Sequence, residues 1–143
     1  MQKIKVETTV HAGLEKVWKY WNEPEYIQWW AFASDDWECP MATNDLRIGG
    51  RFLTRMSAKD KSFSFDFTGT YTDVVEQRSI TYIMDIADDE DQHRECEITF
   101  VDLGNGTTKI EEAFDPEMTN SEDKQKAGWN AILENFKKLV END

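Results

Sequence analysis

Apolar and polar residues alternate at the start of the chain, and the period then changes. Every second residue is apolar or small over residues 2 to 10, which predicts a strand with one buried face. The next apolar residues fall at helical spacing, and Pro24 interrupts them. Two short helices are therefore predicted, over residues 13 to 21 and 24 to 30.

Residues 31 to 45 show no sustained period, although this segment contains Phe32, Trp37 and Met41. Long irregular segments are often the lids or rims of binding sites. We expect a loop here. Trp37 either gates a binding site or closes the end of the hydrophobic core.

From Leu46 onward the pattern is one of strands joined by short polar turns, which predicts an antiparallel meander. Asn105-Gly106 is typical of a tight hairpin turn. Gly69 in the middle of a strand predicts a bend or bulge. The predicted strands contain Phe52, Thr54 and Met56, then Phe63 to Tyr71, and then cover residues 79–86, 94–101 and 107–114.

The last apolar stripe has the spacing of a long helix, and its residues are Trp129, Ile132, Leu133, Phe136 and Val140. The preceding residues, Thr119 to Glu122, have the pattern of a capping box, which predicts Thr119 as the N-cap. Gln125 and Gly128 continue the stripe backward. Glycine is unfavourable inside a helix, so Gly128 indicates either close backbone packing or an open space.

Alternation assigns a mostly aromatic set of side chains to the inner face of the sheet, with Glu112 among them. A buried carboxylate needs a partner or a raised pKa. Glu112 either reaches solvent at a cavity mouth, or pairs with Arg47 or Arg51, or serves as a ligand anchor or general acid/base. An inner face of aromatic and a few polar side chains resembles either a small-molecule site or an ordinary core with polar groups at its rim.

The chain of 143 residues fits a single domain, residues 1–143, and carries a formal net charge of −13. This charge disfavours nucleic acid and anionic membranes as partners. It favours either a simply well-solvated surface or an acidic patch for a basic partner. The sequence shows no apolar segment typical of a signal peptide or a membrane span, so we expect a soluble, cytoplasmic protein with Cys39 and Cys96 as free thiols.

Several kinds of chemistry lack their usual residues. His11 and His93 have no cysteine or histidine near them at metal-ligand spacing, and no glycine-rich phosphate loop follows a strand. We therefore expect no metal and no cofactor.

Several short segments, in this order and spacing, resemble a known family: Val17-Trp18, Trp29-Trp30, the run from Asp45 to Phe52, the run from Phe67 to Tyr71, and Gly128-Trp129. The chain is similar to the START-like (SRPBCC) superfamily, and within it to homologues of the activator of the ninety-kilodalton heat-shock protein ATPase. This resemblance implies an α+β helix-grip fold. A curved antiparallel sheet would wrap a long C-terminal helix, in the order β-α-α-β6-α, with a cavity between them for lipids, polyketides or other apolar molecules.

The leading hypothesis is non-enzymatic binding of an apolar or aromatic small molecule in that cavity. One alternative is a stress-related, co-chaperone-like module whose acidic surface meets a chaperone. Another is a cyclase or hydrolase with Glu112 as base and Tyr71 or Tyr82 as hydrogen-bond donor. The candidate ligand-binding residues are Trp30, Trp37, Phe52, Phe67, Tyr71, Tyr82, Met84, Glu112, Gln125, Gly128 and Trp129.

Overall fold

The computed structural model describes residues 2–85 and 94–143, and within them the chain forms one sheet and three helices. The end of the strand predicted over residues 79–86, the short polar turn expected after it, and His93 lie outside the described residues. The elements are β1 (Ile4–Val10), α1 (Leu14–Asn22), α2 (Pro24–Trp30), β2 (Trp37–Asn44), β3 (Arg51–Ala58), β4 (Ser64–Val75), β5 (Ser79–Met84), β6 (Arg94–Gly104), β7 (Thr107–Phe114) and α3 (Glu122–Asn142).

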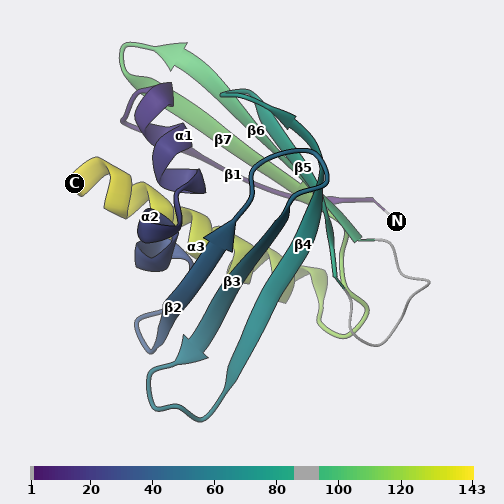
Figure 1. The fold of residues 1–143 in the computed structure, drawn as a ribbon. Helices are drawn as coiled ribbons and strands as arrows, with labels where there is room; N and C mark the ends of the chain where they lie inside the picture. Colours follow the sequence, from purple (N-terminus) through teal and green to yellow (C-terminus); the bar gives the residue numbers. More distant parts are fainter. Residues whose placement is uncertain (1, 86–93) are drawn as a thin grey trace.

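The seven strands pair in the order β1-β7-β6-β5-β4-β3-β2, and each neighbouring pair is antiparallel. Consecutive strands from β2 to β7 are neighbours because short connections join them. The first strand completes the sheet beside β7. In Figure 1 the sheet curls around α3, α2 lies beside β2, and α1 lies beside β6 and β7. This arrangement confirms the predicted helix-grip fold and its element order.

The prediction of a loop over residues 31 to 45 was wrong, because Trp37–Asn44 forms strand β2. The pairing of β2 with β3 shifts register between Glu38 and Met41. This irregularity contains Pro40, which cannot donate a ladder hydrogen bond and is tolerated at a bulge of an edge strand. The two buried residues of β2, Cys39 and Ala42, are consequently three positions apart, which hides the two-residue period.

Gly69 marks a close approach between strands. A Cβ atom there would lie 2.6 Å from the carbonyl oxygen of Ile83 and 2.7 Å from Cε2 of Phe52. The bulge predicted at Gly69 is displaced along the strand, since the register of β4 against β5 shifts between Tyr71 and Asp73. Only glycine therefore lets the Phe52 ring cross this point of the sheet.

The start of α3 also differs from the prediction. Ser121, not Thr119, is the N-cap, and its side-chain oxygen accepts a hydrogen bond from the backbone N–H of Lys124. Thr119 lies two residues before the cap, so the capping box read from the sequence begins too early.

The two halves of α3 have different surroundings, and this difference positions the site. In the C-terminal half, Leu133, Phe136 and Val140 are fully buried. The Phe136 ring meets those of Trp21 and Trp30 edge to face, with centroids 4.9 and 5.1 Å away. This half is dense core. The N-terminal half, with Gly128, Trp129 and Ile132, lines an open cavity instead.

Candidate functional site

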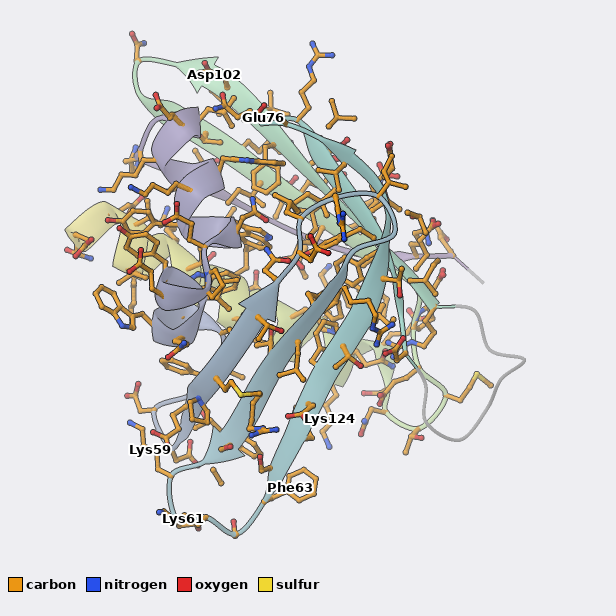
Figure 2. All side chains as sticks on the ribbon, in the orientation of Figure 1. Lys59, Lys61, Phe63, Glu76, Asp102 and Lys124 are labelled. Carbon is orange, nitrogen blue, oxygen red and sulfur yellow. The ribbon has the colours of Figure 1, made fainter. Side chains whose placement is uncertain are left out.

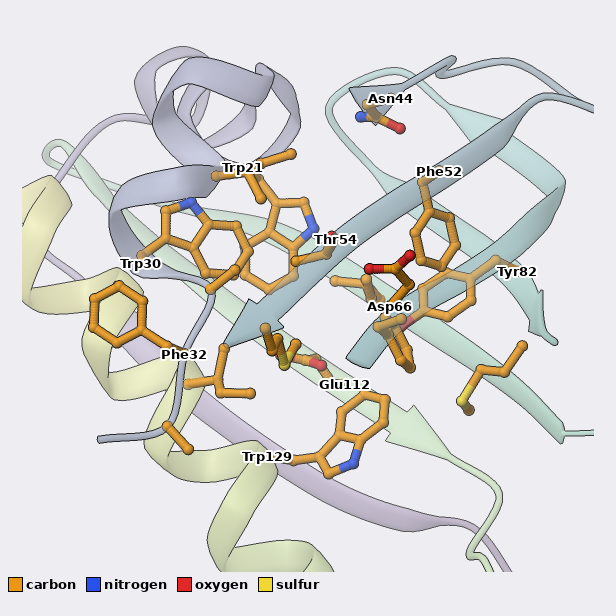
Figure 3. A pocket seen from close by; sticks show the side chains of 18 of the residues that line it. Trp21, Trp30, Phe32, Asn44, Phe52, Thr54, Asp66, Tyr82, Glu112 and Trp129 are labelled. Carbon is orange, nitrogen blue, oxygen red and sulfur yellow. The ribbon is translucent and has the colours of Figure 1, made fainter. Parts of the chain in front are cut away.

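A cavity of about 650 Å³ lies between the sheet and the N-terminal half of α3. Its volume is in the range typical of sites for small organic molecules. Aromatic side chains come into it from α1, from α2 and the segment that follows, and from the sheet (Figure 3). Its aromatic lining residues are Trp21, Trp30, Phe32, Trp37, Phe52, Phe65, Phe67, Tyr71, Tyr82 and Trp129.

The Phe52 ring is the centre of the aromatic wall on the sheet. Its centroid lies 5.5 Å from that of Phe67, 5.4 Å from that of Tyr71 and 4.8 Å from that of Tyr82. These are favourable aromatic separations. The four rings support one another across β3, β4 and β5, so the wall is formed before any ligand enters.

The opposite wall is formed by α3. Trp129 stacks on Phe114 of β7, with ring centroids 3.9 Å apart and planes at 10°. A Cβ atom added at Gly128 would have no heavy atom within 4 Å. Of the two predicted explanations for this glycine, open space is therefore the correct one.

Glu112 of β7 lines the cavity and is only 5% exposed. Its neighbours across the sheet are Val6 of β1 and Ile98 of β6, both buried and apolar. Burial raises the pKa of the Glu112 carboxyl from 4.5 to about 8. At neutral pH most molecules of the unliganded protein consequently carry this group uncharged.

No other residue in the described part of the chain forms a hydrogen bond or ion pair with the Glu112 carboxyl. The predicted partners are engaged elsewhere, Arg47 with Asp45 and Arg51 with Asp85. Among the described residues, every side-chain nitrogen or oxygen atom that is completely shielded from solvent has a hydrogen-bond partner. The Glu112 oxygens therefore face the open cavity, and Figure 3 shows this side chain between Trp129 and the aromatic residues of the sheet.

The other charged residues of the cavity lining all have partners. Asp66 pairs with Arg55, Asp85 pairs with Arg51, Glu117 accepts hydrogen bonds from Asn120, and Arg94 donates to the backbone oxygen of Asp115. Glu112 differs from these groups because none of the described residues forms a hydrogen bond with its carboxyl.

The aromatic wall on the sheet also contains two titratable hydroxyl groups, those of Tyr71 and Tyr82. The Tyr71 hydroxyl donates a hydrogen bond to the side-chain oxygen of Asn44. Burial raises the pKa of Tyr71, and burial together with the nearby Cys96 and Glu112 raises that of Tyr82. Both hydroxyls stay protonated at neutral pH and serve as donors.

The structure brings together all the predicted site residues except Gln125. The Gln125 side chain is buried and bonds to the backbone before its helix: its oxygen accepts from the N–H of Glu117, and its nitrogen donates to the carbonyl oxygens of Glu117 and Asn120. Gln125, a predicted ligand-binding residue, therefore does not line the cavity, because these nearby backbone groups use its amide.

Trp37 lies at the first position of β2 and lines the cavity. Its ring packs edge to face on Phe63 and Phe65, with centroids 6.2 and 6.0 Å away. Phe63 stands at the tip of the β3–β4 hairpin (Figure 2) and is 60% exposed. The predicted gate is thus one member of an aromatic cluster at the outer end of the cavity.

Some lining residues were missing from the predicted site. Trp21 follows the helical stripe of α1, and Phe32 belongs to the segment predicted as a rim, so the sequence held a signal for both. Thr54 alternates with Phe52 and Met56, so the pattern of β3 already placed it on the inner face. Asn44 could not be predicted, because its position depends on the pairing of β2 with β3.

Residues 2–85 and 94–143 contain no group of three or more histidine, cysteine, aspartate or glutamate side chains arranged to hold a metal ion. None of the helices described is both long and apolar enough to cross a membrane.

Solved structures similar to this chain share its fold over nearly the whole length. The AHSA1-like protein from Aeromonas hydrophila is 40% identical, over 98% of this chain and 92% of that chain, with a TM-score of 0.87. A protein from Cytophaga hutchinsonii is 48% identical over the same shares, with a TM-score of 0.79. A protein from Chromobacterium violaceum has a TM-score of 0.85 over the full length of both chains at 21% identity, which shows the fold alone.

None of the curated proteins matches this chain significantly. The family model described as "Activator of Hsp90 ATPase homolog 1-like protein" matches residues 11–141. This match and the relative from Aeromonas hydrophila confirm the resemblance identified from the sequence. The chain belongs to the family of Activator of Hsp90 ATPase homolog 1-like proteins.

Proposed function

We propose that this protein binds an apolar or aromatic small molecule in the cavity between the sheet and α3, without chemical conversion of the molecule. The observation that carries the proposal is Glu112, a buried carboxyl that has no partner among the described residues and faces an open, aromatic space. A buried polar group without a partner costs free energy. A ligand that supplies the missing interaction recovers this cost.

The aromatic walls provide the remaining affinity. Rings held by one another lose little conformational freedom when a ligand enters, so most of the gain from burying its apolar surface is retained. Phe52, Phe67 and Tyr82 form such a wall on one side, and Trp129, held by Phe114, forms the other.

Filling the cavity from α3 tests this proposal. Gly128→Leu places a side chain in the space where a Cβ has no neighbour within 4 Å. Ala127→Leu is the matched control, because Ala127 is the preceding residue of the same helix and is exposed. The measurement is tryptophan fluorescence titrated with a panel of neutral aromatic compounds, preceded by gentle-ionisation mass spectrometry of freshly purified protein.

We expect Gly128→Leu to weaken binding by at least about tenfold, which corresponds to about 1.4 kcal/mol, while Ala127→Leu binds like the original protein. Loss of affinity in both variants, or equal affinity in both, would show that ligands bind elsewhere. The proposal would be refuted if no compound of the panel changed the fluorescence and mass spectrometry found no co-purified molecule.

A co-chaperone-like interaction is the second candidate. The name of the matched family refers to an activator of the Hsp90 ATPase, and the net charge of −13 gives the chain an acidic surface that suits a basic partner. A pull-down with a purified Hsp90-type chaperone at low salt tests it. Retention that disappears at high salt is the expected result, and no retention at low salt would eliminate this candidate.

An enzymatic role for Glu112 stays a prediction. A carboxyl whose pKa is raised to about 8 has a suitable value for general acid/base catalysis near neutral pH. Tyr82, on the neighbouring wall, is a protonated donor. Turnover that is unchanged in Glu112→Gln would exclude this assignment.

A further inference from the structure

The chemistry around Glu112 also indicates which ligands the cavity would prefer, on the assumption that it binds apolar molecules as proposed above. The first consideration is the set of groups that face this carboxyl. β5 presents Tyr82 and β6 presents Cys96, and both interact electrostatically with Glu112. Burial first, and then the charge of Glu112, raises the pKa of the Cys96 thiol, so both groups are neutral at physiological pH.

Among the described residues, the other elements packed against Glu112 supply no positive charge to it, and the acidic residues of the lining, Asp66, Asp85 and Glu117, have partners of their own. The register partner of Glu112 on β1 is Val6. The cavity-lining residues of α3 are Gly128, Trp129 and Ile132. Arg94, which lines the cavity, directs its guanidinium to the backbone oxygen of Asp115. Within the described residues, the Glu112 carboxylate therefore lacks a counter-ion.

A neutral hydrogen-bond donor alone does not require a glutamate. The cavity already contains a protonated donor in Tyr82, and a tyrosine pays no comparable desolvation cost at neutral pH. The distinctive property of a buried carboxyl is that it becomes negative when a cation enters. A ligand cation beside it would gain a close ion pair in a region of low dielectric constant.

Two further features favour a cation. Aromatic rings surround Glu112, and their faces attract ammonium groups. The formal charge of −13 attracts cations toward the molecule at long range and repels anions such as fatty acids. A lipid-like carboxylic acid is thus disfavoured, and an apolar amine is favoured.

We infer that the cavity selects apolar or aromatic molecules that carry a protonated amine, and that this amine pairs with the carboxylate of Glu112. The rest of the ligand would lie against the rings of Phe52, Phe67 and Trp129. Binding then replaces the proton of Glu112 with the ammonium group of the ligand, and the proton is released to solvent.

This exchange gives a pH dependence of defined sign. Below a pKa of about 8, only a fraction of the protein has Glu112 ionised, and that fraction falls about tenfold for each pH unit. The affinity for an amine should therefore rise about tenfold between pH 6 and pH 7, continue to rise toward pH 8, and become constant near pH 9. A ligand that accepts a hydrogen bond from the neutral acid would show the opposite trend.

The experiment compares three probes that share one apolar part: 4-phenylbutylamine, 4-phenylbutanol and 4-phenylbutanoic acid. Isothermal titration calorimetry at pH 6, 7, 8 and 9 measures their affinities. At pH 7, two buffers with different ionisation enthalpies give the number of protons released. Glu112→Gln removes the charge, and Glu111→Gln is the matched control at the next residue of β7, on the outer face of the sheet.

We expect the amine to bind at least about tenfold more tightly than the alcohol at pH 8, and to release about one proton at pH 7. Glu112→Gln should abolish both the preference and the proton release, while Glu111→Gln keeps them. Equal binding of the amine and the alcohol, or an affinity that falls above pH 8, would overturn the inference and leave apolar binding intact. No binding of any probe to a folded protein would instead count against apolar binding itself.

Discussion

The indole ring of Trp129 on α3 stacks face to face on the ring of Phe114 on β7, at a centroid distance of 3.9 Å. Phe114 is fully buried, whereas Trp129 is half-buried and lines the cavity. The stack therefore fixes the helix to the sheet at the point where the dense core ends and the open space begins. Glu112 lies two residues before Phe114, on the same face of β7.

Removing this stack should destabilise the fold. For Trp129→Ala we expect a loss of about 2–3 kcal/mol in the free energy of unfolding, less than for a fully buried tryptophan, because the ring is half-buried. Urea denaturation followed by circular dichroism measures this. Trp29→Ala is the control, since Trp29 is 55% exposed, and its loss should be well below 1 kcal/mol. Equal losses in the two variants would contradict the structural role of the stack.

Gly69→Ala should strongly destabilise the folded protein. Its methyl group would lie 2.6 Å from the backbone oxygen of Ile83 and 2.7 Å from the Phe52 ring. The strand pairing and the aromatic wall must then shift, at a cost of about 2–4 kcal/mol. Gly13→Ala is the control, because a Cβ there has no neighbour within 4 Å. A Gly69→Ala variant with the original unfolding midpoint would show that the sheet has room at this point.

Gly128→Ala should stabilise the folded protein, in contrast to Gly69→Ala. Alanine is favoured over glycine inside a helix by about 1 kcal/mol, and the added methyl group enters open space. We expect a higher free energy of unfolding by up to that amount, measured by the same urea titration. A destabilised variant would mean that the space beside Gly128 closes in solution.

The stability of the protein should fall with rising pH because of Glu112. The pKa of this carboxyl is about 8 in the folded state, and its ordinary value is 4.5, so the folded state holds the proton more tightly. Below pH 4.5 both states are protonated, and the group contributes no penalty. Between pH 4.5 and about 8 the penalty grows by up to about 1.4 kcal/mol per pH unit, and it is constant above that range.

Thermal unfolding of Glu112→Gln at several pH values tests this relation. The variant should be more stable than the original protein at pH 8, and the difference should shrink toward pH 4. Glu111→Gln should show no comparable gain at pH 8, because Glu111 faces outward near Lys5 and Lys109. A constant difference between Glu112→Gln and the original protein at all pH values would contradict the burial of an ionisable group here.

The cap of α3 can be tested at two neighbouring positions. Ser121→Ala removes the oxygen that accepts from the Lys124 N–H and should cost about 1 kcal/mol. Thr119→Ala should change the free energy of unfolding by much less, because Thr119 precedes the cap by two residues. A larger loss of stability in Thr119→Ala than in Ser121→Ala would show that Thr119 is the N-cap.

The elements with a regular period could be predicted from the sequence alone. Alternation along β7 placed Glu112 and Phe114 on the inner face, and helical spacing placed Phe136 and Val140 in the core, as the structure confirms. Such patterns are local, since each side chain is turned inward or outward by its own strand or helix. The resemblance to a known family then gave the correct element order.

Features that depend on distant or irregular partners could not be predicted from local patterns. β2 has no clear period because a bulge at an edge strand interrupts it, and its existence depends on pairing with β3. The amide of Gln125 could have faced either the cavity or nearby backbone, and the geometry of the segment from Glu117 to Asn120 decided in favour of the backbone. The open space at Gly128 likewise results from how α3 crosses the sheet, and so does the position of the Glu112 carboxyl, which has no partner in the described part of the chain.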